Sequence, residues 1–333
     1  MTPISVAMCT FNGERFLAAQ LESFARQTRH PDELVVCDDG SSDRSCEIVR
    51  EFGLRSPFHL RLVVNDRNLG TTKNFEQAMR LCRHPLIALA DQDDVWCAHK
   101  LDRIEKAILA SPSAVGVFSD ADIIDEHSLP LGQRLWRTIG FTRSEQNEFA
   151  EHGGLRVLIK HPVITGATLA FRRQLLNFLT PIPAGEVHDM WISFLMAACG
   201  TVVLIPEPLI QYRQHQSQQI GPGPVTSRQL IAQARNRGPY FYLAEVKRFQ
   251  RLYERLRDCN FDLPDRIRVL NQVARKIRHL EHRAGLPPNR LARIPGVIRE
   301  TLNGDYTRYS GGWRSIAKDL TFTYGGGNPS PNF

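Results

Sequence analysis

The first 110 residues alternate between short apolar runs and stretches with helical spacing, and this alternation constrains the fold more than any other feature. Ile4–Thr10, Leu34–Cys37 and Leu86–Ala90 are apolar runs that end in turn residues, as strands do. The stretch from Arg15 to Thr28 repeats apolar residues at helical spacing. Strands that alternate with helices form a parallel sheet with right-handed crossovers, so we predict an α/β fold.

The later part of the chain continues this pattern and then changes texture. Residues 60–66 predict a fourth strand within the first part, and 114–125 predict a fifth. Residues 188–200 predict an apolar helix and 201–215 a pair of strands. A stretch rich in Gly, Pro, Ser and Gln follows Gln216 and indicates a linker. We therefore predict a catalytic or binding domain over 1–224 and a basic helical region over 225–333. This region is expected to contain helices over about 228–258 and 264–284, a turn at 286–288 and a polar tail with a disordered end.

Charge is distributed unevenly along the chain. Residues 228–333 contain 20 Lys and Arg against 9 Asp and Glu, a net charge of +11, whereas the remaining residues carry −4. A basic region of this kind suits an anionic membrane, nucleic acid or a phosphorylated substrate, and a set of solvated basic helices is the alternative. Of these partners we expect an anionic membrane surface for the basic region, and we expect no nucleic acid.

The composition excludes several other classes of protein. The sequence has no run of about 18 apolar residues, so we expect no membrane span. Its first residues lack the basic and apolar segments of a secretory signal. The seven cysteines form no CxxC pair or zinc-like spacing, which indicates a reduced, cytoplasmic location.

Acidic residues follow two of the predicted strands. Asp38 and Asp39 come directly after one strand, and Asp91, Asp93 and Asp94 follow another. Ligands of parallel sheets bind at the carboxyl ends of the strands, so both clusters belong to the edge where a site is expected. Like charges this close need either water or a cation, and hard divalent cations such as Mg²⁺ or Mn²⁺ prefer carboxylate and phosphate oxygens.

Four segments carry a resemblance to a known family. The segments "VAMCTFNGERFLAAQLESFARQT", "ELVVCDDGSSDRS", "NLGTTKNFEQAM" and "LIALADQDDVWCAHKL" resemble the opening motifs of inverting family-2 glycosyltransferases with the GT-A fold. The likeness covers roughly residues 3–220. Within the family, "DQDDVW", "KNFE" and "YRQH" are most similar to bacterial rhamnosyltransferases of surface-polysaccharide assembly. It implies a Rossmann-like, mostly parallel central sheet with flanking helices and a C-terminal helical extension.

The resemblance implies a nucleotide-sugar site in the first half of the chain. Asp39, with or without Asp38, would accept the imide N–H of uracil or thymine, although an ordinary turn is the alternative for this pair. Asp91 would reach the ribose, and Lys73 either touches the diphosphate or is solvated. Asp94 either belongs to the acidic cluster or caps a helix that starts near Val95. The expected floor of the pocket is formed by Thr10, Asn12 and Glu14.

The resemblance also implies a metal and a catalytic base. Asp93 would bind the Mn²⁺ or Mg²⁺ ion, and His215 matches a family histidine that ligates the metal or touches the diphosphate. Asp189 matches the family's general base, and an acid that stabilises the start of a helix is the alternative. The remaining expected contacts are Gly166, which would let the donor sugar approach the backbone or serve packing, and Trp191, which would form a wall for a sugar or belong to the core.

We therefore expect a metal-dependent inverting glycosyltransferase that uses a dTDP- or UDP-sugar, with dTDP-L-rhamnose as the leading donor. The expected acceptor is a glycan on a lipid carrier, at the inner face of the membrane. A nucleotidyltransferase is the first alternative, but "TFNGERF" is a poor substitute for the Gly-rich basic loop of those enzymes. A non-catalytic module that binds sugar nucleotides or polyanions is the second, and Asp189 argues against it because binding alone needs no base.

Overall fold

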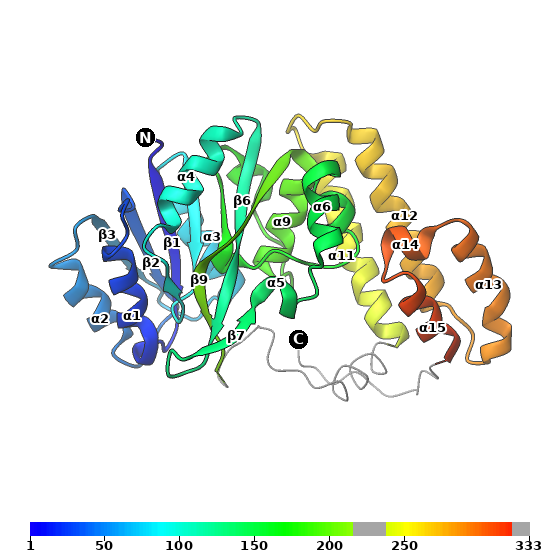
Figure 1. Ribbon diagram of the computed structural model, residues 1–333, viewed down its shortest axis with the longest axis horizontal. Helices are drawn as coiled ribbons and strands as arrows, with labels where there is room; N and C mark the ends of the chain where they lie inside the picture. The colour runs from blue at the N-terminus through cyan, green and yellow to red at the C-terminus, as the bar shows by residue number, and fades with distance from the viewer. Residues whose placement is uncertain (216–237, 322–333) are drawn as a thin grey trace. The chain divides into compact units, whose positions relative to one another are not determined.

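The computed structural model describes residues 1–215 and 238–321, and these form two compact units (Figure 1). The first unit comprises Met1–Gly154 and Val163–Pro222, and the second comprises Leu155–Pro162 and Gly223–Phe333. The predicted boundary between 224 and 225 lies outside the described residues, as does the predicted disordered tail.

A single mixed sheet forms the centre of the first unit. Its nine strands within the described residues run in the order β3-β2-β1-β4-β8-β6-β9-β5, with β7 paired to β6. β1, β2, β3 and β4 are parallel, as predicted, whereas β8 is antiparallel to both of its neighbours. The strands are β1 Ile4–Thr10, β2 Glu33–Asp38, β3 His59–Val64, β4 Leu86–Ala90, β5 Val95–Trp96, β6 Ala114–Ile124, β7 Pro130–Arg134, β8 Leu169–Arg172 and β9 Thr201–Arg213.

The prediction of two strands over 201–215 was wrong, because β9 is continuous. Pro206 and Pro208 suggest a break, since proline cannot donate a ladder hydrogen bond. The strand accommodates them through a shift in register against β6, where Ile205 lies opposite Ser119 but Pro208 lies opposite Asp120. Such a bulge bends a strand without ending it.

Helices cover the sheet and join its parallel strands. The buried faces of α1 and α4 contribute Leu17, Leu21, Phe24, Leu101 and Ile104 to the core cluster beneath β1, β2 and β4. The helical segments of this unit are α1 Glu14–Ala25, α2 Ser45–Gly53, α3 Thr71–Leu81, α4 Lys100–Ala110, α5 Leu135–Thr138, α6 Arg143–His152, η1 Gly166–Thr168, η2 Arg173–Leu175, α8 Leu176–Leu179 and α9 His188–Cys199.

Strand register brings the acidic clusters to one edge. Thr10 at the end of β1 pairs with Asp38 at the end of β2, which pairs in turn with Val64 at the end of β3. On the other side of β1, Met8 pairs with Ala90, so Asp91 follows β4 near the same level. The carboxyl ends of the parallel strands therefore meet at the edge where the site was predicted.

The second unit is helical. α11 packs along α12, and the aromatic rings of Tyr242 and Phe249 are buried beside the cationic groups of Arg283 and Lys276. The sequence predicted helices over about 228–258 and 264–284, but three further helices follow where a polar tail was expected. The helices are α7 Leu155–Leu158, α11 Pro239–Asp258, α12 Arg266–Ala284, α13 Arg290–Leu302, α14 Asp305–Tyr309 and α15 Trp313–Thr321.

The length and hydropathy of the helices decide whether any of them could cross a membrane. Of the helices in residues 1–215 and 238–321, none combines the length and the apolar character needed to cross a bilayer.

Candidate active site

Asp38 connects the ends of β1 and β2. Its Oδ2 accepts hydrogen bonds from the hydroxyls of Thr10 at 2.7 Å and Ser41 at 2.6 Å, and its Oδ1 accepts the Ser41 backbone N–H at 2.8 Å. Asp38 is fully buried, and Thr10 is 2% exposed. Both carboxylate oxygens are thus used to shape the turn after β2.

Asn12 and Glu14 hold the same turn from the loop after β1. Asn12 has a φ of 47°, in the left-handed region that Asn tolerates better than most residues. Its Oδ1 accepts the Ser42 N–H at 2.9 Å, and Glu14 Oε2 accepts the Arg44 N–H at 3.0 Å. Both side chains are exposed, so they line the surface of this loop pair while they hold it together.

Asp39 fixes the loop between β3 and α3. Its Oδ1 accepts the Leu69 N–H at 2.8 Å and the Asn65 side-chain amide at 2.9 Å, and its Oδ2 accepts the Gly70 N–H at 2.9 Å. Gly70 has a φ of 80°, which a side chain would disfavour. Asp39 is 3% exposed. Three donors satisfy it, and Oδ2, with a single bond, retains capacity to accept another.

Lys73 lies on the first turn of α3 and is bonded within the protein. Its ammonium group donates to Glu76 Oε2 at 2.8 Å and to the backbone carbonyl of Ile182 at 2.6 Å. Two fifths of the side chain remains exposed. Lys73 therefore connects α3 to the segment before α9, which differs from the freely solvated lysine considered as the alternative.

Gln92 is a site residue that the sequence did not identify. Its side-chain amide forms two hydrogen bonds with the backbone of Phe11, accepting the N–H at 2.9 Å and donating to the carbonyl at 3.1 Å. This pair of bonds joins the loop after β4, which contains Asp91, Asp93 and Asp94 and is called the acidic loop, to the loop after β1. No charge or motif marks this role, because the partner is backbone.

Four ionisable groups gather around the loop after β4: Asp91, Asp93, Asp189 and His215. His215 Nε2 lies 2.8 Å from Asp93 Oδ2, and both side chains are largely buried. Burial, followed by the charges of Asp93 and Asp189, raises the pKa of Asp91 to about 7. The charges of Asp91, Asp93 and Asp189 therefore interact, although Asp189 comes from a different part of the chain from the other two.

Asp94 does not cap a helix, and that alternative is corrected. Val95 and Trp96 form the short strand β5, and α4 begins only at Lys100. Asp94 Oδ1 instead accepts the Arg213 N–H at 3.0 Å, while its Oδ2 is buried without a hydrogen-bond partner in the described part of the chain. Burial and the neighbouring acids raise its pKa well above the usual range.

Lys100 is a buried lysine whose pKa is affected by the charges of Asp94 and Asp91. Its ammonium donates to the Ala167 carbonyl at 2.7 Å and lies 3.6 Å from the centre of the Trp96 ring. Burial lowers its pKa to about 7, while the charges of Asp94 and Asp91 act in the opposite direction. This buried amine is therefore held by Ala167 and Trp96, close enough to Asp94 and Asp91 for their charges to interact when it is protonated.

Arg213 is a second residue that the sequence did not identify, although it lies inside the quoted "YRQH". Its guanidinium donates to the backbone carbonyl of Asp93 at 2.7 Å and to the hydroxyl of Ser128 at 2.9 Å. Arg213 is 1% exposed, and its guanidinium stacks 4.7 Å from the centre of the Phe16 ring. It holds the acidic loop against the end of β9, two residues before His215.

Asp189 lies in the first turn of α9. Its Oδ2 accepts the backbone N–H of Gly166 at 3.1 Å, and its Oδ1 is buried with no hydrogen-bond partner among residues 1–215 and 238–321. An unpaired buried carboxylate oxygen is costly, so an oxygen kept in this state indicates a group that meets a ligand.

His188 lies beside Asp189 and shares this property. Both ring nitrogens are buried without a partner in the described residues, and the ring stacks on Phe75 at 4.1 Å. Burial lowers the pKa of His188, whereas the charge of Asp189 opposes that shift. A methyl group at Gly166 would lie 2.8 Å from His188 Nε2, so only glycine fits without a shift of the histidine.

Trp191 lies in the core. It is 1% exposed, and its indole N–H donates to the backbone carbonyl of Leu179 at 2.9 Å. Of the two interpretations of this residue, the structure therefore matches the packing role and corrects the expectation of a wall that meets a sugar.

The side chains around the acidic loop include carboxylates and a histidine, which are possible ligands of a divalent cation. No cluster of three or more His, Cys, Asp or Glu side chains in the described residues is arranged to enclose a metal alone. Mg²⁺ and Mn²⁺ at nucleotide sites take one or two carboxylates and complete their coordination with phosphate and water. Asp93, with the imidazole of His215 2.8 Å away, offers at most such a partial set, so a cation here would depend on diphosphate and water oxygens to complete its coordination.

These features define a GT-A type of fold with an acidic site at the carboxyl edge of its sheet. The chain belongs to glycosyl transferase family 2, whose model matches residues 5–179. Members of this family are inverting glycosyltransferases.

Several curated proteins are similar to this chain. An uncharacterized glycosyltransferase of Nostoc sp. is 28% identical over 64% of the chain and 65% of its own length. The UDP-Glc:alpha-D-GlcNAc-diphosphoundecaprenol beta-1,3-glucosyltransferase WfgD of Escherichia coli is 26% identical, over 58% and 69%. The dTDP-rhamnosyl transferase RfbG of Shigella flexneri is 25% identical, over 64% and 73%. The chain spans less than two thirds of the length of the Nostoc protein and of a Mycobacterium tuberculosis relative.

Solved structures share the fold at low identity. Residues 1–349 of Staphylococcus aureus TarS in complex with UDP-GlcNAc match with a TM-score of 0.57 and 14% identity, over 98% of both chains. The mannosyltransferase PcManGT of Pyrobaculum calidifontis in complex with GDP-Man and Mn²⁺ matches with a TM-score of 0.53 and 16% identity, over 96% of this chain and 85% of the other.

Proposed function

We propose that this protein is a metal-dependent inverting glycosyltransferase that uses a pyrimidine-diphosphate sugar. The leading donor is dTDP-L-rhamnose, and the acceptor is a glycan precursor on a lipid carrier. The similarity to RfbG supports the rhamnosyl donor, and the similarity to WfgD, a diphosphoundecaprenol glucosyltransferase by name, supports the lipid-linked acceptor. The observation that carries the proposal is the convergence of Asp91, Asp93 and Asp189 at one edge of the sheet.

Binding of the nucleotide is assigned to the turns after β1 and β2. Asp39 Oδ2 accepts the imide N–H of uracil or thymine, a contact that cytosine cannot make because it has no donor there. Asp38 supports this contact indirectly, since its own oxygens are used by Thr10 and Ser41. Asn12 and Glu14 form the surface on which the base rests.

Asp93 and His215 would hold the cation, with Asp91 beside them on the ribose side. A divalent cation at this position would supply positive charge that stabilises the leaving diphosphate. Arg213 and Gln92 keep the acidic loop in place through its backbone and through Phe11. When protonated, Lys100 reduces the net negative charge of Asp91 and Asp94 without contacting the ligand.

Asp189 acts as the general base. Its Oδ1 removes the proton from the acceptor hydroxyl while that oxygen attacks the anomeric carbon on the face opposite to the diphosphate. The bond from Gly166 N–H to Oδ2 orients the carboxylate so that Oδ1 is directed to the reaction. Gly166 also lets His188 and Asp189 pack directly against its backbone, because a methyl group there would lie 2.8 Å from His188 Nε2.

The first experiment measures thermal stabilisation of the full chain by a panel of sugar nucleotides, each with and without Mn²⁺. We expect dTDP- and UDP-sugars to raise the melting temperature in the presence of Mn²⁺, and dTDP-rhamnose to raise it most. Asp39→Asn should remove the preference for uracil and thymine, whereas the exposed control Asp66→Asn should keep it. A larger shift with GDP- or CDP-sugars would refute the assignment of the base site.

A further inference from the structure

One face of α13 is apolar and exposed. Its four large side chains recur at spacings of three and four residues, so they form one stripe along the helix. Leu291 is 74% exposed and Leu302 is 82% exposed. The opposite side of the helix carries the buried residues Arg293, Val297 and Glu300. The exposed stripe consists of Leu291, Ile294, Ile298 and Leu302.

α15 extends this surface. Ile316 and Leu320 of α15 join α13 in lining an apolar groove of about 240 Å³. Trp313, at the start of α15, is 73% exposed, whereas Trp96, Trp136 and Trp191 are each at most 3% exposed. An exposed tryptophan beside an apolar stripe is typical of proteins that lie at a membrane interface. The stripe, the groove and Trp313 together are called the α13–α15 face.

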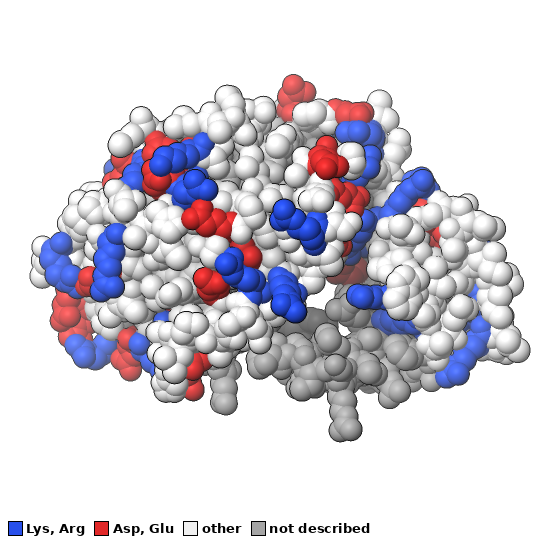
Figure 2. Space-filling model, in the orientation of Figure 1, with Lys and Arg blue, Asp and Glu red and all other residues white. Residues whose placement is uncertain are grey.

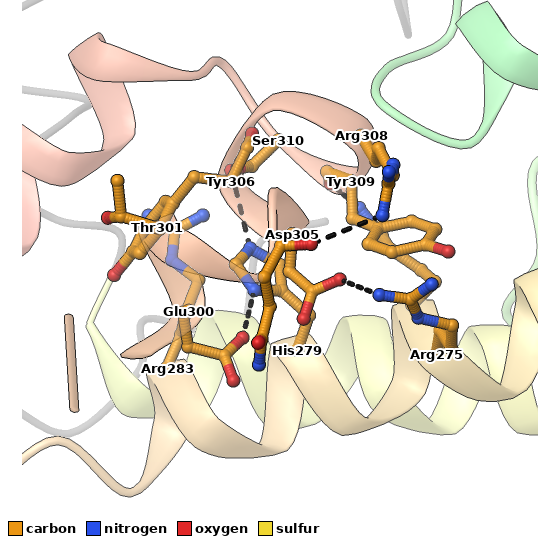
Figure 3. A network of polar contacts seen from close by, with 12 residues as sticks. Arg275, His279, Arg283, Glu300, Thr301, Asp305, Tyr306, Arg308, Tyr309 and Ser310 are labelled. Carbon is orange, nitrogen blue, oxygen red and sulfur yellow. Dashed lines mark hydrogen bonds and ion pairs between the residues drawn. The ribbon is translucent and has the colours of Figure 1, made fainter. Parts of the chain in front are cut away.

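The acids of this segment are all paired inside the unit. Glu300 accepts from His279 at 2.8 Å and Asp305 accepts from Arg275 at 2.7 Å (Figure 3). Asp319 accepts from Arg283 at 2.7 Å. Within residues 286–321 these three are the only Asp or Glu, and each is at most 8% exposed. Each of these carboxylates is therefore bonded within the unit, to a histidine or an arginine, and contributes little to the exposed surface.

The charges that remain exposed on this segment are positive. Figure 2 shows white and blue atoms with little red over the C-terminal helices at the right of the view. An apolar stripe with cations around it and no exposed acid is complementary to an anionic lipid surface, where acyl chains take the apolar side chains and headgroups take the guanidinium groups. The exposed cations of residues 286–321 are Arg290, Arg299, Arg308 and Arg314.

We propose that the α13–α15 face docks the protein on an anionic membrane, with the stripe and Trp313 in the interface. A nucleic acid would use the arginines but leave four large apolar side chains in water, so the stripe favours lipid. The sequence predicted a basic surface suited to an anionic membrane, and the exposed stripe adds an apolar contribution to that expectation. The face lies on a different unit from the donor site, so failure of either assignment leaves the other intact.

The first test is co-sedimentation of the full chain with vesicles of phosphatidylcholine containing 30% phosphatidylglycerol, and with pure phosphatidylcholine. Each of Arg290→Gln, Arg299→Gln and Arg314→Gln should lower partitioning roughly fivefold, which corresponds to about 1 kcal/mol per cation. Ile298→Ser/Leu302→Ser should lower it at least tenfold. The matched controls Arg143→Gln and Leu54→Ser, exposed on the other unit, should have no effect.

The second test uses Trp313 as a reporter of insertion. Anionic vesicles should shift the emission of the wild type to shorter wavelength and protect it from aqueous acrylamide, and Trp313→Phe should abolish both changes because the other tryptophans are buried. Equal binding to neutral and anionic vesicles, or no loss in the variants, would overturn the proposal. Binding that depends on the arginines but not on the stripe, with similar binding to RNA, would reassign the face to polyanions.

Discussion

The imidazole of His215 lies 2.8 Å from the carboxylate of Asp93, although 122 positions separate the two residues. The contact is formed because β9 ends beside the acidic loop after β4, where Arg213 binds the backbone of Asp93. One strand end therefore supplies both a residue that holds the loop and a second donor atom beside the carboxylate. Removing the side chain of either Asp93 or His215 should therefore weaken binding of the same ligand.

Asp93→Ala should abolish the Mn²⁺-dependent part of donor affinity, because it removes the carboxylate assigned to the cation. His215→Ala should reduce the same component by about 10- to 100-fold, the usual cost of disturbing a metal's close partners. Calorimetric titration of a nucleotide diphosphate with and without Mn²⁺ measures both effects. Asp66→Ala is the control, and unchanged Mn²⁺ dependence in Asp93→Ala would rule out the metal assignment.

Asp189→Asn should lower turnover by on the order of 10²-fold or more while donor affinity stays nearly constant, since the change keeps size and removes basicity. The amide oxygen can still accept the Gly166 N–H, so the loop should stay in place. Steady-state rates combined with donor titration separate the two quantities. Asp102→Asn on the surface of α4 serves as the control, and near-normal turnover in Asp189→Asn would exclude it as the base.

Gly166→Ala should destabilise the first unit by about 1–3 kcal/mol, because the added methyl group would press on the buried ring of His188. The same substitution in a His188→Ala background should cost much less. A double-mutant cycle by urea unfolding, followed through the buried tryptophans, measures this coupling. Additive costs would mean that the clash is relieved elsewhere and that the two residues act independently.

Lys276 should make the stability of the second unit rise with pH. Burial lowers its pKa from 10.5 to about 7, so between these values the unfolded chain holds a proton that the folded chain does not. Stability is then gained as pH rises from 7 towards 10.5, by about 2 kcal/mol between pH 7 and 9. Below pH 7 both states are protonated and this dependence disappears.

Lys276→Met should remove that component. Hydrogen exchange of the α12 amides, corrected for the intrinsic pH dependence of exchange, reports on this unit by itself. The protection of the wild type should increase relative to Lys276→Met as pH is raised from 7 to 9. A constant difference between the two proteins over this range would mean that Lys276 stays charged when folded. Lys247→Met on α11 provides the control for a change of net charge.

The strands were predictable where apolar runs end at clear turns. Ile4–Thr10 and Leu86–Ala90 were predicted with the bounds that the structure shows, because buried parallel strands are apolar throughout. The helix α13 was missed because Pro295 and Gly296 lie inside it and both disfavour helix interiors. Packing of Val297 against Leu286 and Tyr306 offsets that preference, and such tertiary contacts are not visible in the sequence.

The strand pattern alone predicted only the acids of the site, whereas Thr10, Asn12 and His215 were named from the family resemblance. Carboxylates after parallel strands follow a general rule of α/β folds, so Asp38, Asp39, Asp91 and Asp93 could be assigned to one edge. Gln92 and Arg213 act on backbone atoms, and the sequence contains no sign of which backbone they meet. Trp191 illustrates the opposite error, since its position next to Asp189 suggested a ligand contact while its side chain is directed into the core.

The amide of Gln92 pairs with Phe11 as one strand residue pairs with another, and this extends the connection between β1 and β4 beyond the ends of both strands. These two hydrogen bonds therefore hold the acidic loop against the loop between β1 and α1. A ligand that pulls on the acids would move Phe11 and the start of α1 with them. Under the proposed function, these two bonds directly connect the loop assigned to the cation with the loop assigned to the base.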